Sequence, residues 1–295
     1  MTTTSVTLQH PLDQQTASLL LRLAITAKKQ GIDMLLVGAF AREVLFYHAH
    51  GIVTSISTMD TDISVYVEDW AAFYRLRKAL ELVDFDLKKD LVEKIVDKAS
   101  GKEVDLIPFG PVAGDDALLV WPNDGPTWNV LGFDEALGAA TAILLQTSTG
   151  EAVSVPMVTI SSLVMLKIMS FYDRPKERIR DVRDIGFVIR HYLDAGNRER
   201  LMAQPDLVAL AAQKPDEAAA VLLGQDIGCM ACAATKKFLA DKLKHEITSK
   251  SACPLAHTLA SQSCKGNFSV ARALLQSLLE GIESRKRQNR GQPLD

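Results

Sequence analysis

The sequence lacks a long hydrophobic run and a strong charge of either sign. No apolar run approaches the ~18 residues that span a membrane. The opening residues MTTTSVTLQHPLDQQ have neither a basic nor an apolar segment, so we expect no signal peptide. A net charge of -3 does not indicate passive coating of nucleic acid, so any such contact would require a local patch. These absences favour a cytoplasmic protein.

Cysteine is scarce and confined to the last third of the chain, at Cys229, Cys232, Cys253 and Cys264. The first pair has the spacing of a metal-binding or redox motif, whereas the second pair lacks it. Because the surrounding pattern looks helical, we expect thiols buried on helix faces. A zinc or redox protein built on the cysteines is the competing interpretation.

The 295 residues, 47% of them hydrophobic and 23% charged, are ordinary for a globular protein of one large or two medium domains. Internal repeats are absent. The chain is therefore long enough for sizeable cores.

One stretch, residues 35–67, organises the chain. An apolar run ends at Gly38 and Ala39, a helical segment carrying Arg42 follows, and Asp60-Thr61-Asp62 opens a second apolar run. The glycine lets backbone N–H groups approach a phosphate closely, and the following helix directs its N-terminus at the anion. This order of strand, glycine, helix and acidic strand favours a nucleotide site.

Asp60 and Asp62 are two residues apart, so in a strand they would point to the same face. Such close carboxylates repel one another unless a cation lies between them, and Mg²⁺ (or Mn²⁺) accepts one or two carboxylates together with substrate phosphates. A solvated turn or strand edge is the alternative.

Asp105 lies inside a predicted strand at 103–107, between apolar neighbours. If this strand pairs beside the strand that Asp60 opens, the two backbones lie ~4.8 Å apart and three carboxylates can converge. The usual separation of two catalytic metals, ~3.5–4 Å, fits such a cluster. Otherwise Asp105 faces solvent.

Lys167 lies in an apolar helix, where it either extends to water or pairs with an anion. The charged run at 174–184 is typical of a solvated helix face, or it holds the base or an RNA backbone. Arg42 likewise forms either a surface salt bridge or part of the site.

A long segment at 110–129 is rich in Pro, Gly and Asp and contains Trp121 and Trp128. A loop of this kind is often functional, for example as a base-stacking or acceptor-guiding flap, or it covers the sheet edge. The basic tail at 284–290 is expected to be frayed and solvated, with RNA contact as the alternative.

Periodicity predicts an α+β fold, in which a mixed sheet with flanking helices precedes an all-helical domain. The boundary falls near Val158, giving a catalytic domain at 1–158 and a helical domain at 159–295. Strands are predicted at 33–37, 61–67, 91–96, 103–107, 142–147 and 152–156. Helices are predicted at 17–31, 39–50, 67–83, 161–172, 179–195, 197–202, 207–212, 216–223, 232–244 and 270–284.

The sequences GAFAR (38–42), TMDTDI (58–63) and VDL (104–106) resemble the signature of polymerase-beta-type nucleotidyltransferases. Further sequences resemble the AbiEii-like branch, which contains toxins of type IV toxin–antitoxin systems: WPNDG (121–125), NVLGF (129–133), LK (166–167) and RDVRD (180–184). The resemblance covers about residues 34–192.

This resemblance implies roles for matching residues. Gly38 and Ala39 would cradle the triphosphate, although Ala39 lacks the hydroxyl that many members have. Asp60, Asp62 and Asp105 would be the metal-binding and catalytic carboxylates, with Asp105 receiving or orienting the proton of the acceptor.

Lys167 would be catalytic and meet phosphate charge, and Asp184, together with Asp181, resembles the helical acid of the family. The nucleotide-binding set implied is Gly38, Ala39, Arg42, Lys167 and Asp184.

The function implied is Mg²⁺-dependent transfer of NMP from an NTP such as ATP or GTP to an acceptor hydroxyl, on an RNA 3′ end (tRNA) or a protein. A cognate antitoxin is expected if the chain is a toxin. The alternatives are transfer to a small molecule such as an antibiotic, housekeeping tRNA maturation, and a non-catalytic nucleotide-binding module.

Overall fold

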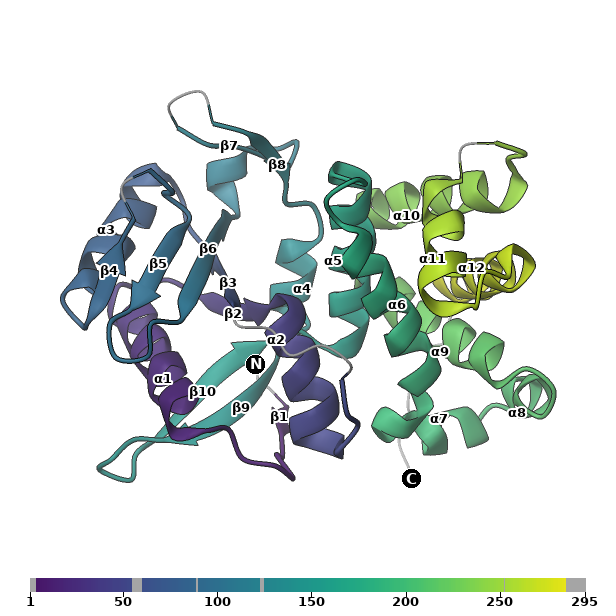
Figure 1. Cartoon of the computed structure of the whole chain (residues 1–295), viewed down its shortest axis with the longest axis horizontal. Helices are drawn as coiled ribbons and strands as arrows, with labels where there is room; N and C mark the ends of the chain where they lie inside the picture. The colour runs from purple at the N-terminus through teal and green to yellow at the C-terminus, as the bar shows by residue number, and fades with distance from the viewer. Residues whose placement is uncertain (1–3, 55–59, 89, 123–124, 252, 285–295) are drawn as a thin grey trace, which may run out of the picture. The chain divides into compact units, whose positions relative to one another are not determined.

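The computed structural model describes residues 4–54, 60–88, 90–122, 125–251 and 253–284 (Figure 1). The contacts divide the chain into two compact units, 1–196 and 197–295. The domain boundary expected near Val158 stays a prediction; the first compact unit extends past it and includes two further helices, α5 (Ile160–Asp173) and α6 (Ile179–His191).

The first unit contains a mixed eight-stranded sheet, which confirms the predicted α+β class. In spatial order the strands are β1 (Ser5–Val6), β9 (Thr141–Gln146), β10 (Ala152–Met157), β2 (Met34–Val37), β3 (Thr61–Tyr66), β6 (Glu103–Phe109), β5 (Lys94–Asp97) and β4 (Phe85–Leu87). All four residues of β2 are buried, as expected for a strand covered on both faces. The predicted strands are confirmed, with shifts of a few residues at some ends, whereas β1 and β4 are too short to show a pattern.

The helices of the first unit follow the prediction closely. Besides α5 and α6 they are α1 (Gln14–Lys29), α2 (Gly38–Glu43), α3 (Trp70–Glu81) and α4 (Phe133–Gly138). A wider, π-helical turn (Val44–His48) continues α2, so the predicted helix at 39–50 is one segment with a local expansion. The short α4 was not predicted.

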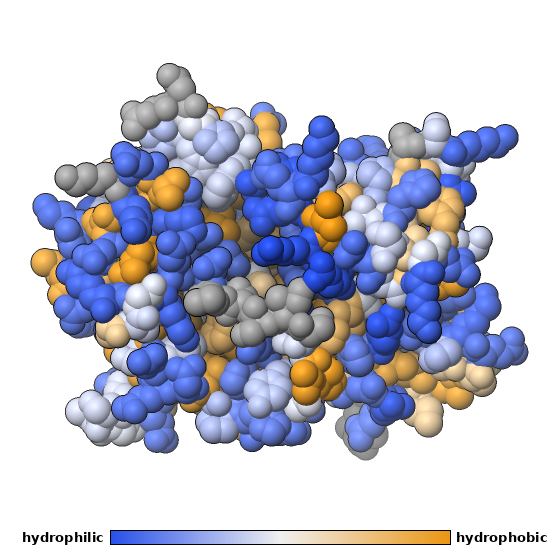
Figure 2. Space-filling model, in the orientation of Figure 1, coloured by the Kyte–Doolittle hydropathy of each residue, from blue (hydrophilic) through white to orange (hydrophobic). Residues whose placement is uncertain are grey.

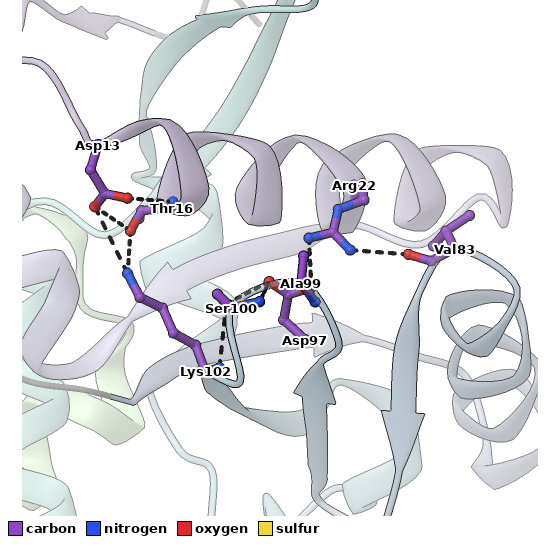
Figure 3. Close-up of polar contacts among 8 residues, drawn as sticks. All are labelled: Asp13, Thr16, Arg22, Val83, Asp97, Ala99, Ser100 and Lys102. Atoms are coloured by element: carbon purple, nitrogen blue, oxygen red, sulfur yellow. Dashed lines mark hydrogen bonds and ion pairs between the residues drawn. The ribbon is translucent and has the colours of Figure 1, made fainter.

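Polar contacts attach α1 to the turn that joins β5 and β6 (Figure 3). Asp13 caps the helix by accepting a hydrogen bond from the backbone N–H of Thr16 at 2.9 Å, and Lys102 Nζ donates to Thr16 Oγ1 at 2.5 Å. Further along α1, Arg22 Nη2 lies 2.7 Å from Oδ1 of the buried Asp97. These contacts hold α1 beside the edge of the sheet that carries β5 and β6.

The segment at 110–129 is not the loop that its composition predicted. It forms a second, two-stranded sheet from β7 (Leu118–Val120) and β8 (Thr127–Asn129), preceded by a 3-10 turn at Pro111–Ala113. Strands of three residues are too short to show alternation, and this explains the wrong prediction.

The second unit is helical, as predicted. It contains α7 (Arg198–Met202), α8 (Pro205–Ala211), α9 (Pro215–Met230), α10 (Ala233–Thr248), α11 (Pro254–Ser263) and α12 (Phe268–Glu283). Only α11 was missed. The buried Glu246 carboxylate accepts hydrogen bonds from the backbone N–H groups of Leu255 and Ala256 at 3.1 and 2.9 Å. It thus supplies acceptors for two N–H groups in the first turn of α11, which have no partner within the helix.

The cysteines do not behave uniformly. Cys253 is buried and Cys264 half-buried, but Cys229 and Cys232 are exposed, so the expectation of buried thiols is wrong for the first pair. Cys232 caps α10 at the turn after α9, and this position leaves its side chain at the surface. The basic tail at 285–290 lies outside the described residues.

The face in Figure 2 is largely hydrophilic, with hydrophobic residues in small separate patches. No helix in the described part of the chain is long and apolar enough to cross a membrane.

Backbone contact between α9 and α12 depends on glycine. A Cβ on Gly281 would lie 2.1 Å from the carbonyl oxygen of Val221, and one on Gly224 would lie 2.2 Å from that of Leu278. Because backbone cannot yield as a flexible side chain does, any larger residue must push the helices apart.

We therefore predict that Gly281→Ala destabilises the second unit by about 2–3 kcal/mol. Chemical denaturation, with hydrogen exchange of α9 and α12 as the local readout, measures this loss. Gly138→Ala at the end of α4 is the control, since its Cβ would meet no atom within 4 Å. Equal stability of the two variants would contradict the packing argument.

Candidate active site

Two carboxylates meet on neighbouring strands of the main sheet. β3 and β6 run parallel, and their register places Asp62 beside Asp105. Neighbouring backbones in a sheet lie ~4.8 Å apart, so the two half-buried side chains leave the sheet close together. The predicted pairing of these strands is confirmed.

Asp60 does not share this arrangement. It precedes the first residue of β3 and is exposed, so the alternation of the strand does not fix its direction. Thr58 of the same motif lies outside the described residues. Among the residues that the structure describes, no group of three or more His, Cys, Asp or Glu side chains is arranged to hold a metal ion. The predicted metal role of Asp60 thus stays a prediction.

Gly38 closes the site from the side of β2. Its φ of 72° lies in the region that favours glycine, and a Cβ there would lie 1.9 Å from Oδ2 of Asp62. Val37, the residue before it, is the register partner of Asp62. Only glycine allows the backbone at the start of α2 to lie this close to the carboxylate, and Ala39 follows in the same turn.

The carboxylate of Asp62 is held at high electrostatic cost. Burial, and then the charge of Asp105, raise the pKa of Asp62 to about 6, although Lys167 and Arg178 act in the opposite direction. A site that disfavours its own negative charge is stabilised by a cation. Asp62 and Asp105 are hard oxygen donors, so their chemistry fits a divalent ion such as Mg²⁺.

Sequence reasoning missed the partner of Asp105. Lys94, its register partner on β5, places Nζ 2.8 Å from Asp105 Oδ1 and 3.1 Å from Glu103 Oε2. Burial alone would lower the pKa of Lys94, but hydrogen bonds to both acids raise it. Only the strand register reveals this contact.

A second, buried cluster connects α2, α5 and α6. Lys167 Nζ lies 2.7 Å from Asp181 Oδ1 and 2.7 Å from Asp184 Oδ2, and Asp184 also pairs with Arg42. Burial by itself lowers the pKa of Lys167, but the two carboxylates outweigh it and raise the pKa. Lys167 therefore pairs with anions instead of extending to water, and Arg42 is a buried ion-pair partner, not a surface one.

This ion-pair cluster lies near the carboxylate pair, because Arg42 follows Gly38 by one turn of α2 and the backbone of Gly38 lies against Asp62. The charges of Lys167 and Asp181 accordingly act on the pKa of Asp62. The structure thus brings together Gly38, Asp62 and Asp105 at the sheet, and Arg42, Lys167, Asp181 and Asp184 beside it. Arg178, which also acts on Asp62, was noted in the sequence only as part of a charged run.

Comparison with known families decides how this site is classified. Residues 57–226, more than half of the chain, match the family described as nucleotidyl transferase AbiEii toxin, Type IV TA system. The chain belongs to this family. Membership in the AbiEii family identifies the chain as a nucleotidyltransferase, and it confirms the resemblance inferred from the sequence motifs.

Comparison with curated proteins gives no significant match. Several solved structures are similar at low identity, and three of them represent the range. The antibiotic-resistance factor ANT(2'')-Ia is 13% identical, with 65% of this chain and 96% of that chain covered and a TM-score of 0.36. An antigenic nucleotidyltransferase-like protein from Paracoccidioides brasiliensis is 17% identical, covering 76% and 98%, with a TM-score of 0.38.

The third is the Thermotoga maritima CCA-adding enzyme complexed with tRNA, 13% identical, covering 84% of this chain and 62% of that one, with a TM-score of 0.33. At these identities and TM-scores, we base no argument on the three structures.

The raised pKa of Asp62 has a consequence for stability. With an ordinary value of 3.8 in the unfolded chain and about 6 in the folded one, the unfolded chain loses the proton first as the pH rises. Stability of the metal-free protein therefore falls between about pH 4 and 6 by up to about 3 kcal/mol.

We predict that Asp62→Asn stabilises the metal-free protein at pH 7–8, with the gain vanishing near pH 4. Denaturation at several pH values measures it; a gain independent of pH would exclude this cause.

Removing Lys167 leaves the half-buried Asp181 close to the buried Asp184, which still pairs with Arg42. We predict that Lys167→Met destabilises the protein by about 3–5 kcal/mol, and that Asp181→Asn in the same chain restores part of the loss. Denaturation of the single and double variants tests this coupling. Additive losses would show that Lys167 and Asp181 do not interact.

Proposed function

We propose that the protein transfers NMP from an NTP to an acceptor hydroxyl, with Mg²⁺ or Mn²⁺ held at Asp62 and Asp105. The observation that supports this proposal is the register pairing of these two carboxylates against Gly38. A bound divalent ion would supply charge neutralisation for the phosphates and the leaving pyrophosphate.

The remaining roles, binding of the triphosphate and activation of the acceptor, belong to residues of the chain. The backbone at Gly38 and Ala39 faces the triphosphate, and Asp105 orients the acceptor hydroxyl and takes its proton. Asp60, at the exposed entrance to β3, is proposed as the third metal ligand. Positioning of the acceptor in line with the α-phosphate provides most of the acceleration.

The ion-pair cluster serves the nucleotide if Lys167 exchanges one carboxylate for phosphate. Asp181 is the more exposed of its two partners, with 14% of its side chain accessible against 8% for Asp184. We propose that Asp181 is the partner released, whereas Asp184 keeps Lys167 and Arg42 in place.

The family description supports a toxin role, with a cognate antitoxin as partner. We propose an RNA 3′ end, such as that of tRNA, or a protein hydroxyl as the acceptor. The cytoplasm, which holds NTPs and both kinds of acceptor, is the proposed location.

We predict that the wild-type protein transfers label from at least one α-labelled NTP to total RNA or protein when Mg²⁺ or Mn²⁺ is present. Asp62→Asn, Asp105→Asn and Gly38→Ala should each lower the rate at least about 100-fold, because each removes or displaces a carboxylate that stabilises the reacting centre. Gel or filter analysis of the labelled acceptors measures this.

Asp86→Asn is the matched control, since Asp86 lies on edge strand β4 with 65% of its side chain exposed. Undiminished transfer by Asp62→Asn would reject the proposed site. Label confined to a small acceptor would replace the RNA and protein acceptors, and absence of transfer with every NTP would favour a non-catalytic nucleotide-binding module.

A further inference from the structure

The β7–β8 hairpin carries two tryptophans with different surroundings. Trp121 is 5% exposed, and its ring lies 5.2 Å from that of Trp70 and 6.0 Å from that of Phe73, both on α3. A side chain packed in this way anchors the hairpin to the helix. The role of Trp121 is therefore structural: it anchors the hairpin to α3.

Trp128 lies on the other strand, half-buried, with its ring 5.1 Å from that of Trp121. The guanidinium of Arg174, the residue that ends α5, lies 4.8 Å from the centre of the Trp128 ring. Arg174 keeps 28% of its side chain exposed, and its closest carboxylate atom, Asp173 Oδ2, is 3.4 Å away. The pair thus places a half-buried aromatic ring against a planar, partly exposed cation.

The pair is close to the candidate active site. Burial, followed by the charge of Arg178, lowers the pKa of Arg174, and the same Arg178 acts on Asp62. Arg174 directly follows α5 and comes seven residues, two helical turns, after Lys167, so roughly 10 Å of helix separates the pair from the ion-pair cluster beside the carboxylates.

The indole N–H of Trp128 also lacks an acceptor. Within the described residues, the Nε1 atoms of Trp121 and Trp128 are buried and have no hydrogen-bond partner. Unsatisfied buried donors are rare and require an explanation. A small shift of the Trp128 ring toward a ligand carrying a ring nitrogen or a carbonyl oxygen would supply the acceptor.

We propose that Trp128 and Arg174 form the subsite for the base of the NTP, an inference that rests on the proposed function. A nucleobase matches the subsite because it has a π-face for the indole and the guanidinium and acceptors for the N–H group. Stacking accepts every base, so the subsite takes nucleotides with only modest preference among them.

Calorimetric titration of the full chain with each NTP and with inorganic tripolyphosphate separates base contacts from phosphate contacts. Stacking on one base gives about a 10- to 100-fold effect. We expect Trp128→Ala to weaken NTP binding by this factor while tripolyphosphate binding changes less than about twofold. Arg174→Gln should weaken NTP binding in the same direction, and Trp128→Phe should retain most of the affinity.

Trp70→Ala is the matched control, because it removes a tryptophan that supports the hairpin without reaching Arg174. In a Trp70→Phe, Trp121→Phe protein, Trp128 is the sole tryptophan, and its fluorescence should be quenched by NTP but not by tripolyphosphate. Quenching of this fluorescence would report contact between the base and Trp128 directly.

Equal weakening of NTP and tripolyphosphate by Trp128→Ala, or equal weakening by Trp70→Ala, would reduce Trp128 to a structural role and overturn the inference. Unchanged NTP affinity in Trp128→Ala would overturn it too, while leaving the proposed function intact. Failure of the wild type to bind any NTP would reject the proposed function and, with it, the base subsite.

Discussion

Repulsion between two carboxylates on adjacent parallel strands is the constraint on which the site depends. The pairing of β3 with β6 places Asp62 beside Asp105, and burial then raises the pKa of Asp62 to about 6. The surroundings compensate only in part: Lys94 takes the Asp105 carboxylate, and the backbone of Gly38 lies against Asp62. A fold that maintains such a pair bears an electrostatic cost that a divalent cation would relieve.

Two cationic side chains near the site, Lys167 and Arg42, already form ion pairs with carboxylates. Lys167 and Arg42 are buried with Asp181 and Asp184, so two positive and two negative charges balance within one cluster that ties three helices together. The positive charges of this cluster are therefore largely neutralised by its own carboxylates. Attraction of a triphosphate must then come from the metal, from exchange of Asp181, or from arginines such as Arg178.

The sequence predicted the central strands and most helices because their periodicity and their glycine stops are long and clear. It also predicted that Asp60, Asp62 and Asp105 converge if their two strands pair; the register brings Asp62 and Asp105 together, whereas the role of Asp60 stays a prediction. It could not predict the Lys94 contact, which depends on strand register, or the β7–β8 hairpin, whose strands have only three residues. Cys229 and Cys232 are exposed because they lie at and just beyond the C-terminal end of α9, and helix propensities define the ends of helices poorly.

The central claim is that Asp62 and Asp105 together bind a divalent cation. The most direct measurement is Mn²⁺ binding followed by electron paramagnetic resonance, with a non-hydrolysable NTP analogue present, in the wild type, Asp62→Asn and Asp105→Asn. The account predicts a bound-Mn²⁺ signal in the wild type that both variants lose. Equal Mn²⁺ binding by all three proteins would contradict it.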